Sequence, residues 1–144
     1  MNRGFMFAIL AALSFGMWQV FHVRASNLIH PVLGALLVSL IAVLASVPFL
    51  VISYRSSNEV SFTSTGMLFV VLAGICAFIV DYLVLKAYAT SLPVSVGGPI
   101  IIGVSIAVTV VAGLFMGEAF SMLKSVGIVL ILLGAAILAS LETA

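Results

Sequence analysis

Five long apolar stretches, separated by short polar segments, constrain this chain more than any other feature of its sequence. Each is about 20 residues long or longer, so a helix rising about 1.5 Å per residue would cross the roughly 30 Å hydrocarbon core of a bilayer. Membrane barrel strands are about half as long and alternate polar with apolar residues. The sequence therefore predicts an all-α membrane protein. The expected spans cover residues 4–23, 31–53, 66–89, 94–116 and 122–141.

Charged side chains are too few for water to be the solvent around these stretches. Hydrophobic residues make up 65% of the 144 residues, and Asp, Glu, Lys and Arg only 6%, whereas soluble domains carry roughly 45–50% and about 25%. A chain this short has too high a surface-to-volume ratio to hide so much apolar surface. We therefore expect lipid to cover it. The net charge of +1 offers no electrostatic basis for binding nucleic acid.

The polar links between the expected spans are short, which predicts one domain (1–144) whose consecutive helices are antiparallel neighbours. Pro31 is well placed to begin the second helix, and Pro48 is expected to kink or end its last turn. The segment Arg24–Asn27 is expected to be a link. The longest polar segment, Tyr54–Thr65, is expected to be a loop.

Positive charges are divided almost evenly between the two sides of the expected bundle. Arg3, Arg55 and Lys124 fall on the side of the N-terminus, and Arg24 and Lys86 on the other side. The positive-inside rule therefore favours a cytoplasmic N-terminus only weakly. Two interpretations stay open: a single orientation, or dual topology, in which the chain inserts both ways and pairs with an inverted copy of itself.

Asp81 is the strongest functional candidate because it is the only acid inside an expected span. Burying a carboxylate in the bilayer costs at least about 2.5–3.5 kcal/mol, so Asp81 should face protein or water. Gly74, Ala77 and Tyr88 share its stripe of the helix, and we assign Asp81 and Tyr88 to binding of a substrate or coupling ion. The alternative is a structural ion pair, for which the sequence offers Arg24, His22 and Lys86.

Four further candidates share one face of the first expected helix. Ser14, Trp18 and His22 follow one another at intervals of four residues, with Gln19 alongside. Indole and imidazole groups stack on ligands or hydrogen-bond to them, and imidazoles in general titrate near neutral pH. This pattern predicts a substrate or ion path. The alternative is that Trp18 and His22 mark the membrane interface.

Small and hydroxyl residues line one face of the fourth expected helix, namely Gly98, Ser105, Thr109, Gly113 and Gly117. We count the two hydroxyl groups, on Ser105 and Thr109, among the candidate substrate contacts. Gly113 and Gly117 form a GxxxG pattern, which is common where membrane helices approach closely. Helix packing is therefore the favoured interpretation of these glycines, with a cavity wall as the alternative.

A succession of motifs in the second half of the chain resembles a known family. Asp81–Pro93 ends the third expected helix, Pro99 lies early in the fourth, Gly117-Glu118 closes it, and Gly127–Gly134 runs through the fifth. This order and spacing resemble an EamA-type repeat and the last three helices of small multidrug resistance proteins. The first half is similar more loosely. The chain thus resembles a half-size, single-repeat member of the drug/metabolite transporter superfamily.

The resemblance implies an antiparallel dimer, because most relatives carry two such repeats in opposite orientations. The second copy would be the chain itself or a related half-size chain, around a central substrate cavity. Gly127 and Gly134 would then form a dimerisation strip, with packing inside one chain as the alternative. Small multidrug resistance proteins use a Glu in their first helix, and this chain has no acid there. We expect a multi-pass protein of a prokaryotic cytoplasmic (inner) membrane.

These observations favour a secondary, proton-coupled exporter of a metabolite or of a drug-like or cationic compound. The alternative is a non-transporting or heterodimeric subunit, for example half of a lipid-linked sugar flippase. An enzyme is disfavoured because the spans hold no second carboxylate for paired acid–base work, and we assign no catalytic residue and no cofactor. Two histidines and a single cysteine, Cys76, do not predict a metal site.

Overall fold

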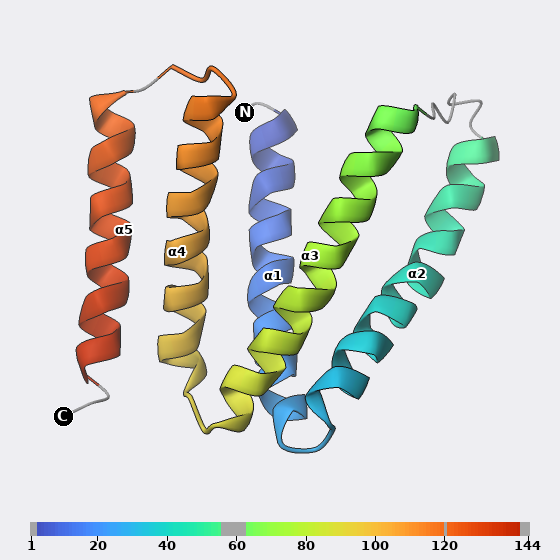
Figure 1. Cartoon of the computed structure of the whole chain (residues 1–144), viewed down its shortest axis with the longest axis horizontal. Helices are drawn as coiled ribbons and strands as arrows, with labels where there is room; N and C mark the ends of the chain where they lie inside the picture. The colour runs from blue at the N-terminus through green and yellow to red at the C-terminus, as the bar shows by residue number, and fades with distance from the viewer. Residues whose placement is uncertain (1–2, 56–62, 120, 142–144) are drawn as a thin grey trace. The chain divides into compact units, whose positions relative to one another are not determined.

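The computed structural model describes residues 3–55, 63–119 and 121–141, and all the regular structure in them is helical. This confirms the all-α prediction for the described part of the chain, and Figure 1 colours the helices from blue at the N-terminus to red at the C-terminus. The five helices are α1 (Arg3–Ser26), α2 (Pro31–Arg55), α3 (Ser64–Ala89), α4 (Val94–Phe115) and α5 (Met122–Leu141).

Four of these helices are long and apolar enough to cross a membrane. These helices are α1 to α4. Only 6% of the apolar window that qualifies each span is buried in α1 and in α2, and 17% in α3 and in α4. Apolar side chains facing outward in such number need an apolar environment. In α5 the apolar stretch Met122–Leu138 is shorter, although the whole helix has 20 residues. That α5 spans the membrane stays a prediction.

Several helix ends differ from the sequence-based boundaries. The segment Arg24–Asn27 was expected to be a link, but α1 continues to Ser26, whose buried hydroxyl donates a hydrogen bond to the Val23 carbonyl at 2.9 Å. Pro48 does not end α2, which continues to Arg55. Residues 56–62 of the expected loop lie outside the described residues, and Thr63 caps α3 by accepting a hydrogen bond from the Gly66 N–H at 3.1 Å.

The chain divides into two compact units. One consists of Met1–Phe21 with Ser91–Ala144, and the other of His22–Thr90. In the first unit α4 lies against α5, and in the second α2 lies against α3 (Figure 1). Each pair consists of consecutive helices of the chain, which explains their antiparallel packing. A single domain over 1–144 stays a prediction.

Candidate functional site

His22 and Asp81 form a buried pair inside the unit His22–Thr90. The Nε2 atom of His22 lies 3.2 Å from Oδ1 of Asp81, and only 4% and 10% of the two side chains are exposed. The structure thus selects His22 from the three partners that the sequence offered. Burial at this level also shows that His22 faces protein, rather than outward as an interface-marking residue would.

Neither of the other two offered partners is buried. Arg24 is exposed at the end of α1. The Lys86 Nζ lies 5.8 Å from the centre of the Tyr82 ring, close enough for a cation–π contact, and Lys86 is exposed. Asp81 therefore has the His22 imidazole, and not a lysine or arginine side chain, as its partner in this pair.

The face of α3 that carries Asp81 continues with buried, largely apolar side chains. Val84, Leu85 and Tyr88 follow Asp81 on the same side of the helix and are at most 4% exposed. Leu85 packs on Gly34 of α2, where an added Cβ would lie 2.6 Å from the Leu85 Cδ1. The absence of a side chain at Gly34 is what lets α2 and α3 approach here.

The N-terminal part of the expected stripe on α3 is not buried. Gly74 and Ala77 are exposed, and no atom lies within 4 Å of a Cβ built on Gly74. Within this unit, Asp81 and Tyr88 are therefore the buried members of the stripe.

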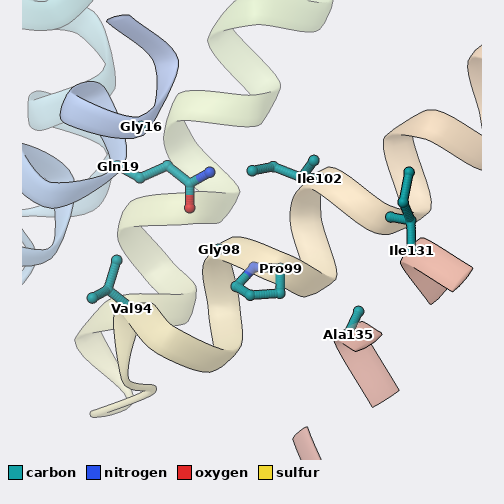
Figure 2. A pocket seen from close by; sticks show the side chains of 8 residues that line it. All are labelled: Gly16, Gln19, Val94, Gly98, Pro99, Ile102, Ile131 and Ala135. Atoms are coloured by element: carbon teal, nitrogen blue, oxygen red, sulfur yellow. The ribbon is translucent and has the colours of Figure 1, made fainter. Parts of the chain in front are cut away.

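The second site is an open pocket in the unit that joins Met1–Phe21 with Ser91–Ala144. Its volume is about 280 Å³, and it lies among α1, α4 and α5. Gln19, a candidate from the sequence, lines it and is 3% exposed. Figure 2 shows the Gln19 side chain reaching from α1 toward α4. The other lining residues are Gly16 of α1, Val94, Gly98, Pro99 and Ile102 of α4, and Ile131 and Ala135 of α5.

Two glycines of α4 shape this part of the unit. A Cβ added to Gly98 would lie 2.9 Å from the Gln19 Oε1, so only glycine leaves room for the amide in its present position. A Cβ on Gly103 would meet the Ala135 Cβ at an ordinary 3.5 Å. Gly103 is buried and forms the close approach of α4 to α5.

The hydroxyl candidates do not join the pocket. Ser14, Ser105 and Thr109 donate to carbonyls of their own helices, those of Leu10, Ile102 and Ile106, at 2.8–2.9 Å. All three are exposed, and none lines the pocket that contains Gln19.

Trp18 forms an aromatic stack on α1. Its ring lies 4.9 Å from that of Phe15, with an interplanar angle of 19°. This is the offset geometry that aromatic pairs favour.

Gly113 and Gly117 lie at the C-terminal end of α4, and their role in helix packing stays a prediction. Gly117 lies beyond the end of α4 with φ of +85°, a conformation that suits glycine at a helix end. The Glu118 N–H donates to the Gly113 carbonyl at 2.9 Å, and the Glu118 carboxyl group lies over Gly113. These two glycines therefore end α4 and accommodate Glu118.

Gly127 and Gly134 on α5 are open within the described chain. No atom lies within 4 Å of a Cβ built on either residue. Packing inside this chain, the alternative interpretation of this strip, therefore does not occupy these two positions. Their role in a dimer stays a prediction.

Several lining residues could not be found from the sequence. Val94, Ile102 and Ile131 are ordinary apolar residues, and nothing distinguishes them from the other apolar residues of their helices. Gly98 offered a signal, since a small residue near Pro99 is unusual in a helix interior. Among the described residues, no group of three His, Cys, Asp or Glu side chains could hold a metal ion.

A family match covers nearly the whole chain. The model of the family described as EamA-like transporter family matches residues 2–140. The matched range contains both the His22–Asp81 pair and the pocket with Gln19. A search of curated proteins and a search of solved structures found no match.

Proposed function

The chain belongs to the EamA-like transporter family, and from this membership we propose that it exports small molecules by proton-coupled alternating access in a dimer. The family makes it a multi-pass membrane transporter of the drug/metabolite superfamily; members of this family are transporters, not enzymes. The substrates in this proposal are metabolites or drug-like compounds, cations among them, and the membrane is a prokaryotic inner membrane.

The observation that carries the proton coupling is the buried His22–Asp81 contact at 3.2 Å. With a proton on the imidazole, the pair is an imidazolium and a carboxylate with no net charge. Once that proton leaves, the pair carries a net negative charge in a buried place, which is costly. Release of the proton therefore favours either access of water to the pair or arrival of a cation. Alternating access needs a link of this kind between protonation and conformation.

The dimer rests on independent support. Transporters with inverted repeats place substrate between two related halves and exchange the roles of those halves. A single five-helix repeat supplies one half, so a second copy in the opposite orientation would supply the other. The near-even division of positive charge and the open positions at Gly127 and Gly134 both agree with such an arrangement.

Transport into proteoliposomes tests the coupling. We expect vesicles with an acidic lumen and a clamped membrane potential to accumulate at least one compound of a panel that includes tetraphenylphosphonium. Asp81→Asn should reduce this accumulation at least about tenfold, because an amide is neutral whether or not His22 holds a proton.

The matched control is Glu118→Gln. Glu118 is an exposed carboxylate beyond the end of α4, 3.7 Å from Lys124, and its substitution should leave accumulation unchanged. Undiminished, pH-driven accumulation by Asp81→Asn would contradict the proposal. A chain that only assembles with a partner would show no accumulation, and its assembly would not depend on Asp81.

A further inference from the structure

The pocket between α1, α4 and α5 has a size that limits its ligand. A dry protein cavity of about 150 Å³ holds benzene, so about 280 Å³ accommodates a bicyclic ring or a single ring with a short substituent. Larger drug-sized ligands occupy pockets of about 300–1,000 Å³. A ligand held wholly inside the pocket is therefore a small compound.

The lining limits the charge of the ligand. Gln19 carries the one polar side chain among the residues that line this pocket in the described chain. Its carboxamide is neutral and offers both donors and an acceptor. An ion in such a pocket would lose its hydration without gaining an opposite charge, which is costly. A neutral group such as an amide, hydroxyl or carbonyl would gain a hydrogen bond instead.

Gln19 is held in a defined place. The residue is 3% exposed, and its Oε1 atom lies against Gly98, 2.9 Å from the position of a Cβ there. Figure 2 shows the amide between α1 and α4 at the edge of the pocket. A ligand that hydrogen-bonds to this amide would be favoured over a ligand of the same shape that cannot.

We propose that this pocket is the substrate site for a small neutral ring compound with one hydrogen-bonding group, which Gln19 recognises. The inference rests on the proposed transport function and narrows its substrate class. Within that class it favours neutral compounds over cations, amino acid zwitterions and carboxylates.

Three isosteric probes test the charge selectivity. They are 2-naphthamide, which is neutral, 2-naphthamidinium, which is cationic, and 2-naphthoate, which is anionic. Binding is measured by isothermal titration calorimetry on the full chain in nanodiscs, with empty nanodiscs subtracted to remove partitioning into lipid. We expect the amide to bind at least about tenfold more tightly than either ion. No binding of the amide, or preference for an ion, would overturn the proposal.

Variants then place the ligand in the pocket. Gln19→Leu keeps the size of the side chain and removes the hydrogen bond, so affinity for 2-naphthamide should fall about tenfold. Gly98→Ala should weaken binding because its Cβ displaces the amide, and Ala135→Phe should abolish binding by filling the space. The control is Ala136→Phe, at an exposed neighbouring position that does not line the pocket, and it should bind normally.

The readouts separate this inference from the proposed function. Gel filtration and helical circular dichroism confirm that each variant is folded, and Gly98→Ala offers a second route should Gln19→Leu fail these checks. Normal binding by Gln19→Leu and Ala135→Phe would overturn the pocket assignment while Asp81-dependent transport stood. Amide binding that depends on Gln19 would support the pocket even in a chain that showed no proton coupling.

Discussion

Gly34 provides a test of how α2 and α3 pack around the face that carries Asp81. An alanine at this position would place its Cβ 2.6 Å from the Leu85 Cδ1 and 3.2 Å from the Ile29 Cγ2. Ordinary contacts are longer by about 1 Å, so Leu85 would have to move. Since Leu85 is 1% exposed, it has little free space, and we expect Gly34→Ala to strain this contact.

The magnitude follows from two opposing terms. Overpacking of a filled site costs about 1–3 kcal/mol, whereas replacing glycine by alanine inside a helix stabilises it by about 1 kcal/mol. Gly74→Ala is the matched control, because nothing lies within 4 Å of its added Cβ and only the favourable term applies. Gly34→Ala should therefore be less stable than Gly74→Ala by about 1–3 kcal/mol.

The assay is unfolding by SDS in mixed micelles, followed by near-UV circular dichroism. Tyr88, at 2% exposure, lies on the same face of α3 as Leu85 and gives a local signal. A double-mutant cycle with Leu85→Ala isolates the contact, since the truncated side chain leaves room for a Cβ at Gly34. We expect a coupling free energy of about 1–3 kcal/mol between the two substitutions.

Two results would refute the reasoning. One is equal stability of Gly34→Ala and Gly74→Ala. The other is a coupling free energy below about 0.5 kcal/mol, which is the limit of additivity for independent sites. Either result would mean that α2 and α3 are not in close contact at Gly34.

Three further predictions concern helix ends and orientation. Thr63→Ala removes the cap on the Gly66 N–H and should cost about 1 kcal/mol, seen as faster amide exchange in the first turn of α3 but not of α4. Gly117→Ala should destabilise the chain by about 1–2 kcal/mol because φ is +85° there, whereas Gly74→Ala should not; equal thermal midpoints would contradict this. Accessibility tags on each terminus should be labelled from both faces of the membrane if the chain has dual topology, and labelling from one face only would exclude an inverted homodimer.

The sequence alone determined the helices, because runs of about 20 apolar residues are stable only as spans in lipid. It also singled out Asp81, since the cost of a carboxylate in the bilayer does not depend on the fold. Helix ends were less predictable: the boundary near Arg24 was placed too early, because a polar link and a polar last turn look alike.

Only the tertiary structure decided which residues lie together. Three side chains were available to Asp81 by sequence, and the packing of the unit His22–Thr90 brings His22 to 3.2 Å. The pocket with Gln19 depends on Gly98 and on apolar residues of α4 and α5, whose spacing along the chain carries no sign of their meeting. Apolar side chains of a membrane helix can face lipid or another helix at similar free energy. Their pattern therefore predicts the membrane span, and only packing decides which helix they contact.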